Sequence, residues 1–144
     1  DYSRWYATAD TYPQNAVRGP IVMVTNQWAG SDGDIVAAAT QAMGYAKVIG
    51  ERSWGGVVGI DGRFDLVDGT SVTQPRYAGW YGSYGWGVEN HGVDPDIVVT
   101  VSPEDWEADR DVQLDAAIAE CLRQLDDKPA ATAPELPGPA FGRR

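Results

Sequence analysis

The hydrophobic pattern of the first third of the chain predicts a strand, a helix and a second strand. Five consecutive apolar or β-branched residues at 21–25 (IVMVT) are typical of a strand buried on both faces of a sheet. Apolar residues then return at helical spacing over 33–43, and Gly44 is a typical C-terminal stop. Residues 47–50 (KVIG) predict the next strand. Such a βαβ unit is expected to have parallel strands.

The pattern then changes to short apolar segments separated by turns. Between residues 57 and 75, two Asp-Gly pairs at 61–62 and 68–69 divide three apolar segments. Asp-Gly is a favoured two-residue hairpin turn, so this region predicts a meander of three strands. Residues 76–92, rich in Tyr, Trp and Gly, predict an ordered loop rather than a regular element.

The last third of the chain predicts one strand and two helices. Residues 95–101 (PDIVVTV) are typical of a buried strand. Ser102 follows as a candidate N-cap, with a proline and two acids in the first turn after it. An amphipathic stripe over 111–125 predicts the second helix. Cys121 lies on that stripe, so a buried thiol is expected.

Charge and composition exclude several classes of function. Eleven basic and twenty-one acidic residues give a formal net charge of −10, which argues against nucleic acid as the main partner. The acidic surface favours solubility, or an affinity for cationic peptides. No apolar run approaches the length of a membrane span. One histidine and one cysteine cannot build a zinc site, so neither metal nor cofactor is expected.

Ser31 occupies the corner between the strand predicted at 21–25 and the helix predicted at 33–43. Helix N-terminal N–H groups beside a hydroxyl stabilise an oxyanion, so a serine at this corner is well placed to be a nucleophile. The alternative is an N-cap, whose hydroxyl accepts a hydrogen bond from a free backbone N–H. The local pattern alone favours the cap.

Three motifs extend the argument beyond the local pattern. They are the serine motif at 26–34 (NQWAGSDGD), the glycine motif at 50–60 (GERSWGGVVGI) and the glutamate motif at 87–96 (GVENHGVDPD). Together and in this order they resemble the catalytic half of the tricorn-type proteases, a branch of the C-terminal processing (tail-specific) serine peptidases. The resemblance runs from Gly19 to about Leu125.

The resemblance implies a role for each of three residues. Ser31 is the nucleophile, the backbone N–H of Asp32 is an oxyanion donor, and Glu89 orients the base. In the tricorn branch the base is a histidine that acts with a second serine, and both belong to a segment upstream of these residues. Many tail-specific peptidases instead use a lysine in the glycine motif, where this chain has Gly56. We therefore expect the chain to lack its base and to be inactive alone.

Other interpretations remain open for these residues. The Asp32 side chain suits the first turn of a helix in its own right, and Glu89 is otherwise a surface or ion-paired carboxylate. His91 lies two residues from Glu89 but does not match the catalytic histidine, so we interpret it as a loop residue. The aromatic loop at 76–92 fits a wall of a substrate cleft, a subunit interface or ordinary loop packing. A platform for carbohydrate is less well supported.

The resemblance also implies an organisation and a function. We expect an arm or linker at 1–19 from an upstream part, a catalytic domain at 20–127 and a flexible tail at 128–144. The expected fold is α/β and crotonase-like, an open sheet with a βαβ unit, a hairpin meander and flanking helices. The expected protein is a cytoplasmic serine peptidase that trims peptides, a homo-oligomer such as a hexamer, with this chain as its nucleophile-bearing C-terminal portion. The alternatives are an inactive scaffold or oligomerisation domain of the same fold, and a crotonase-type acyl-transfer enzyme.

Overall fold

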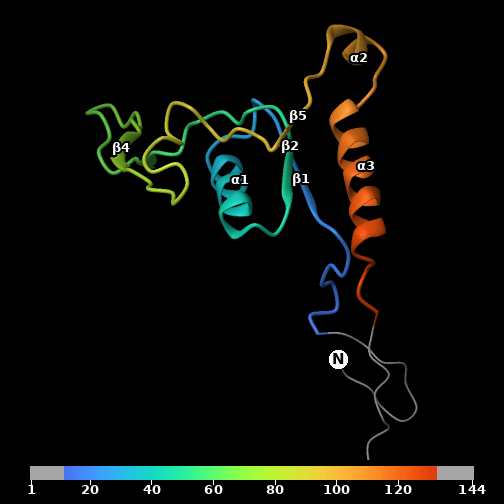
Figure 1. The fold of residues 1–144 in the computed structure, drawn as a ribbon. Coiled ribbons are helices and arrows are strands. Elements are labelled where there is room, and N and C mark those ends of the chain that lie inside the picture. The colour runs from blue at the N-terminus through green and yellow to red at the C-terminus, as the bar shows by residue number, and fades with distance from the viewer. Residues whose placement is uncertain (1–11, 133–144) are drawn as a thin grey trace, which may run out of the picture. The chain divides into compact units, whose positions relative to one another are not determined.

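A computed structural model describes residues 12–132 of the chain (Figure 1). Residues 1–11 of the arm predicted at 1–19 and residues 133–144 of the tail predicted at 128–144 lie outside the described residues. The structure divides into two compact units, one of which is Ile21–Cys121. The other holds the described residues on either side of it, and its backbone is joined by a hydrogen bond from Ala131 N–H to Arg18 O (2.9 Å).

The larger unit is built on a three-stranded parallel sheet. Its strands are β1 (Val22–Thr25), β2 (Lys47–Gly50) and β5 (Ile97–Val98), in the order β1-β2-β5. Helix α1 (Asp32–Met43) connects β1 to β2 and packs against both strands. The βαβ unit with parallel strands predicted from the sequence is therefore confirmed, and the chain is a mixed α/β protein.

Small residues let α1 lie close to the sheet. Ala37 and Ala38 face Val48 of β2, and the side chains of this core are almost completely buried. The helix ends as predicted at Gly44, which has a left-handed backbone and donates its N–H to the last carbonyls of α1. The register pairs Thr25 with Gly50, so the carboxyl ends of β1 and β2 lie side by side. The serine motif and the glycine motif both begin at this edge.

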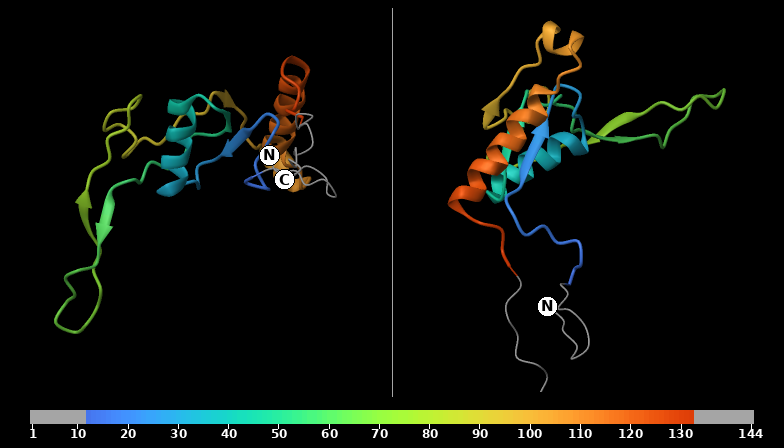
Figure 2. Two further views of the ribbon diagram at one scale, coloured as in Figure 1. Left: turned by 90° about the horizontal axis from the view of Figure 1, so that it is seen from below. Right: turned by 90° about the vertical axis from the view of Figure 1, so that its right-hand side faces the viewer.

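The predicted meander is wrong in its middle strand, and its last strand lies at 74–77 instead of the predicted 70–73. A single antiparallel ladder joins β3 (Gly59–Asp61) to β4 (Gln74–Tyr77), and residues 63–67 form no strand. The Asp-Gly pair at 61–62 ends β3 instead of turning it, whereas the pair at 68–69 does form a turn. Two short strands with an exposed tip do not supply the neighbour that a middle strand would need. Figure 2 shows this hairpin extending away from α1.

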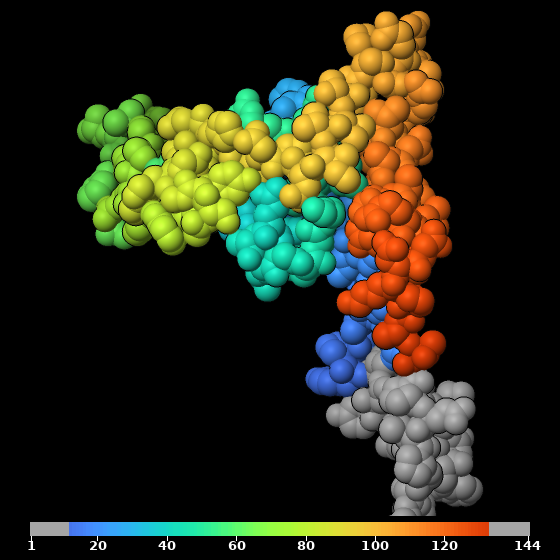
Figure 3. All heavy atoms as spheres, in the orientation of Figure 1, coloured from blue at the N-terminus to red at the C-terminus, as the bar shows by residue number. Residues whose placement is uncertain are grey.

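The aromatic loop predicted at 76–92 is ordered and largely irregular. It contains an isolated bridge between Tyr81 and Gly85, and Tyr81 and Tyr84 pack against the core. Figure 3 shows the loop lying against α1 and the hairpin. Val88, 0% exposed, completes this part of the core.

Several segments that the sequence predicts to be buried are exposed. Val24 of β1 is 41% exposed, and Val98 is 72% exposed in a strand β5 of two residues, against the buried strand predicted at 95–101. On α3 (Val112–Asp127), Leu114 and Ile118 are each half exposed. Apolar runs predict that a surface is covered, and none of the described residues covers these faces.

The two C-terminal helices begin much as predicted. Ser102 caps α2 (Pro103–Glu107) in a capping box with Asp105. Gln113 at the start of α3 donates to Val99 O (2.9 Å). Cys121 is half-buried rather than buried. None of the helices within residues 12–132 has the length and apolarity needed to cross a bilayer.

Candidate active site

The serine motif forms a tight corner between β1 and α1. After β1 the chain turns at Asn26, whose carbonyl accepts the N–H of Ala29 (2.9 Å) and whose side chain accepts the N–H of Trp28 (3.0 Å). Asparagine favours such turns because its side chain binds its own backbone two residues on. The chain then enters α1 through Ser31, which has φ 54° and ψ −111°.

The backbone of Ser31 is strained, and within the described residues no hydrogen bond uses its hydroxyl. A positive φ is rare for a residue with a β-carbon and costs on the order of 1–3 kcal/mol, a strain that gathers at functional sites. Ser31 is exposed and makes no side-chain capping hydrogen bond. The N-cap interpretation therefore loses the interaction on which it depends. A strained strand-to-helix turn that exposes a hydroxyl is the geometry of a nucleophile elbow.

The backbone N–H that follows Ser31 is open. Gly33 N–H donates to Gly30 O (2.9 Å), and Ile35 N–H donates to Ser31 O (3.0 Å). Among the described residues the N–H of Asp32 has no acceptor, as expected for the first residue of a helix. An open N–H beside the hydroxyl, at the positive end of the helix, can bind a developing oxyanion.

Glu89 is held by the glycine motif. Its Oε2 accepts the N–H groups of Val57 and Val58, both at 2.7 Å. Its Oε1 has no partner among the described residues. Glu89 also lines a pocket of about 330 Å³ with Trp86 and Asn90. One carboxylate oxygen is thus fixed, and the other remains able to accept a hydrogen bond.

Backbone hydrogen bonds bring the three motifs together. They run from Trp54 N–H to Ala29 O (3.1 Å), from Ser53 N–H to Val93 O (3.1 Å) and from Asn90 N–H to Gly55 O (2.7 Å). The glycine motif lies between the other two. No hydrogen bond joins Ser31 to Glu89 within residues 12–132, and their positions are linked through this middle segment.

Asp34 is the residue of the site that the sequence reasoning missed. It is 0% exposed and accepts the Ser53 hydroxyl (2.5 Å) and the N–H groups of Gly55 (2.9 Å) and Gly56 (3.2 Å). The signal was present in the sequence, because Asp34 shares the buried face of α1 with Ala37 and Ala38. A carboxylate on an apolar face needs partners, since burying an unpaired charge is costly.

His91 is paired with a carboxylate of its own loop. Its ring Nε2 lies 2.8 Å from Asp94 Oδ2, both side chains are exposed, and Arg52 donates to its carbonyl. No hydrogen bond joins it to Ser31 or Glu89 within the part of the chain that the structure describes. It holds a loop, in agreement with the interpretation from the sequence.

The Trp54 indole occupies the space that a side chain at residue 56 would need. A β-carbon built on Gly56 would collide with the ring, and one built on Gly30 would lie 2.5 Å from its Cε3. A lysine cannot be placed at residue 56 without moving Trp54. The geometry thus agrees with the absence of a Ser-Lys dyad.

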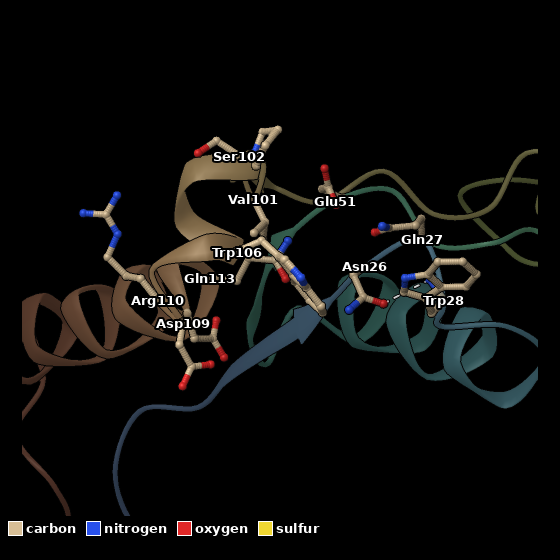
Figure 4. A pocket seen from close by; sticks show the side chains of 12 residues that line it. Asn26, Gln27, Trp28, Glu51, Val101, Ser102, Trp106, Asp109, Arg110 and Gln113 are labelled. Carbon is tan, nitrogen blue, oxygen red and sulfur yellow. Dashed lines mark hydrogen bonds between the residues drawn. The ribbon is translucent and has the colours of Figure 1, made fainter.

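A separate cavity of about 660 Å³ lies beyond the carboxyl ends of β1 and β2. Its lining includes Asn26, which lies between the indoles of Trp28 and Trp106 in Figure 4. Ser31 and Glu89 do not line it. Within residues 12–132 no group of three His, Cys, Asp or Glu side chains could hold a metal ion.

Comparison with known proteins places the chain in a family. The family model described as Peptidase family S41 matches residues 1–99. Tricorn protease homolog 1 of Streptomyces coelicolor is 60% identical over 127 residues, and Tricorn protease of Thermoplasma acidophilum is 48% identical over 118 residues. These matches cover 88% and 82% of this chain but only 12% and 11% of the relatives.

A solved structure of the tricorn protease has the same fold over this region. It superposes with a TM-score of 0.82 at 45% identity, covering 87% of this chain and 12% of that one. The chain therefore belongs to peptidase family S41. The resemblance to the tricorn branch of these peptidases, predicted from the sequence, is confirmed.

Proposed function

We propose that this chain is the nucleophile-bearing C-terminal portion of a tricorn-type serine peptidase that trims peptides. Ser31 attacks the scissile carbonyl, and the N–H of Asp32 binds the oxyanion that forms. Glu89 orients the base system through its Oε1, while its Oε2 stays bound to the backbone. The base histidine and the second serine come from another segment of the protein.

The backbone of Ser31 is the observation that carries this proposal. A strained, exposed serine with an unused hydroxyl, followed by an open N–H, has no structural benefit that offsets its cost. Glu89 Oε1, without a partner among the described residues and on a pocket wall, supports the orienting role because it can accept a hydrogen bond from the base system. The exposed apolar faces of β1 and β5 fit a chain that packs against other parts of a larger protein.

The finer features of the family belong to the same proposal. They are a crotonase-like fold completed by other segments, a cytoplasmic location, assembly into a homo-oligomer such as a hexamer, peptide substrates, and a catalytic domain at 20–127 between a linker and a tail. The 60% identity to a tricorn protease homolog supports them.

Labelling with a fluorophosphonate tests the nucleophile in the full-length natural protein. The probe should modify Ser31, found by peptide mapping, and Ser31→Ala should abolish both labelling and hydrolysis of fluorogenic peptides. Ser83→Ala is the matched control, because Ser83 is exposed in a loop outside the three motifs. Full activity in Ser31→Ala would remove Ser31 from its role. A folded protein that is neither labelled nor active would instead be an inactive scaffold.

A further inference from the structure

Two carboxylates bind four consecutive backbone N–H groups in residues 55–58. Asp34 accepts the first two, at 2.9 and 3.2 Å, and Glu89 accepts the last two, both at 2.7 Å. This segment precedes β3 and belongs to no strand, so carboxylate oxygens take the place of a strand ladder. The same short stretch of backbone therefore connects the helix of Ser31 to Glu89.

Asp34 also reaches the glutamate motif through a side chain. It accepts the Ser53 hydroxyl, and the Ser53 oxygen in turn accepts the N–H of Val93 (2.8 Å). Ser53 is 2% exposed, so this connection is shielded from water. One carboxylate thus links the serine, glycine and glutamate motifs.

Asp34 is held by neutral hydrogen-bond donors rather than by an ion pair. It is 0% exposed, and no lysine or arginine side chain among the described residues pairs with it. A buried carboxylate is costly, and the cost is offset here by neutral donors and by the N-terminus of α1. Without the carboxylate, the Ser53 hydroxyl and the N–H groups of Gly55 and Gly56 would lack an acceptor, so the charge is tied to the position of this backbone.

We propose that Asp34 is a positioning residue that sets the distance between Ser31 and Glu89. It follows Ser31 by one turn of α1, where Ile35 N–H is already bound to Ser31 O. A shift of residues 55–58 against Asp34 displaces the Glu89 carboxylate relative to the nucleophile. The inference rests on the proposed function, because it gives Ser31 and Glu89 the roles stated there.

Asp34→Asn in the full-length natural protein is the central test. The amide keeps one oxygen for two donors but turns its own N–H groups towards the third, so the backbone of residues 55–58 shifts without a change of volume. We expect kcat to fall about 10- to 100-fold with KM nearly unchanged, since a misplacement of about 1 Å has such effects. Fluorophosphonate labelling of Ser31 should slow in parallel.

Asp105→Asn is the matched control for the loss of a buried carboxylate. Asp105 is 7% exposed and also accepts backbone and hydroxyl donors, but it lies outside the three motifs. Its variant should melt at a lower temperature and keep the wild-type kcat. In addition, Asp34→Asn should cost far less in a Glu89→Gln background than alone, because both changes act on one geometry.

The proposal is overturned if Asp34→Asn keeps the wild-type kcat and labelling rate, even if it melts early. If this variant does not fold, Ser53→Ala replaces it, since it breaks the link to Val93 and leaves Asp34 two N–H partners. A severalfold lower kcat at constant KM then supports the proposal, and an unchanged kcat overturns it. Wild-type protein that is not labelled at Ser31 would overturn the proposed function and this inference with it. Labelled wild type with a fully active Asp34→Asn removes the inference alone.

Discussion

Two buried carboxylates, Asp34 and Asp105, perform different work in the same unit of the chain. Asp105 binds within its own turn, accepting the N–H (3.1 Å) and the hydroxyl (2.7 Å) of Ser102 and the guanidinium of Arg110. Asp34 accepts its hydrogen bonds from residues 19 to 22 positions away in the sequence. Asp105 stabilises the start of one helix, whereas Asp34 fixes the positions of distant segments of the chain relative to one another.

From this comparison we expect hydrogen bonds within one turn and hydrogen bonds between distant segments to have unequal consequences when they are lost. Loss of a local cap lets one turn of a helix fray, at a cost of typically about 1 kcal/mol. Loss of a connection between distant segments changes the distances among groups that must act together. Four changes test this distinction, beginning with the largest expected effect.

Glu89→Gln separates the two roles of this side chain, which are to accept backbone N–H groups and to carry a negative charge. Glutamine keeps an oxygen for Val57 and Val58 and removes the negative charge, so the loop should hold its shape while the base loses its orienting group. We expect kcat to fall on the order of 10²-fold or more with little change in KM, as for the third member of a triad. Steady-state kinetics and the melting temperature are the measurements.

Glu104→Gln is the control for this change, because Glu104 is exposed on α2 outside the motifs. A Glu89→Gln variant with normal kcat would make Glu89 a purely structural residue. Its carboxylate would then serve only to hold the backbone of Val57 and Val58.

Gly30→Ala tests the contact between the serine corner and Trp54. The new β-carbon would lie 2.5 Å from Cε3 of the indole, so the ring must move away from the corner. We expect about a 10-fold lower kcat from the displaced geometry and a shift in tryptophan fluorescence. Gly62→Ala is the control, since nothing lies within 4 Å of its new β-carbon. Equal kinetics for the two variants would show that the indole does not hold the corner.

The sequence predicted the local carboxylate and missed the distant one for a physical reason. Ser102, a proline and Asp105 stand within four residues, so their mutual hydrogen bonds can be expected from spacing. The donors of Asp34 come from loop backbone that carries no periodicity. Only the conflict between its charge and the apolar face of α1 pointed to it.

In the rest of the fold, too, features set by local sequence were predicted and features set by distant contacts were not. The βαβ unit followed from apolar periodicity, and the corner at Ser31 followed from the junction of two elements. The middle strand of the meander failed because an Asp-Gly pair at 61–62 specifies a turn only where strands on both sides have partners. The exposure of Val24 and Val98 could not be predicted from this chain, since an apolar run predicts burial without saying which segment covers it.

Asp105→Asn should alter how stability depends on pH. Hydrogen bonds from Ser102, and then the neighbouring Arg110, hold the pKa of Asp105 below its ordinary value. A lowered pKa contributes stability that is present above the unfolded pKa, about 4, and is lost as pH falls through the folded value. The melting temperature of the wild type should therefore fall further between pH 7 and pH 3 than that of the variant, whose residue 105 cannot titrate. An identical loss in both would contradict the assignment.

Ser31→Gly should give the smallest effect on the melting temperature, and it should be more stable than Ser31→Ala. Glycine accepts the φ of 54° without strain, whereas alanine keeps the β-carbon that causes it. Relief of the backbone strain stabilises the glycine variant by about 1–3 kcal/mol, and the greater backbone entropy of glycine in the unfolded chain costs about 0.5–1 kcal/mol. Ser31→Gly should therefore melt a few degrees higher than Ser31→Ala. Both variants should be inactive. If alanine melts at the same temperature or higher, the corner stores no strain.

The position of the Trp54 indole also bears on the evolutionary history of such sites. A β-carbon at residue 56 would meet the ring, and so would one at residue 30. One indole thus restricts two positions of the site to glycine. A lysine at residue 56 would require a second change at Trp54, so the two substitutions are expected to be coupled.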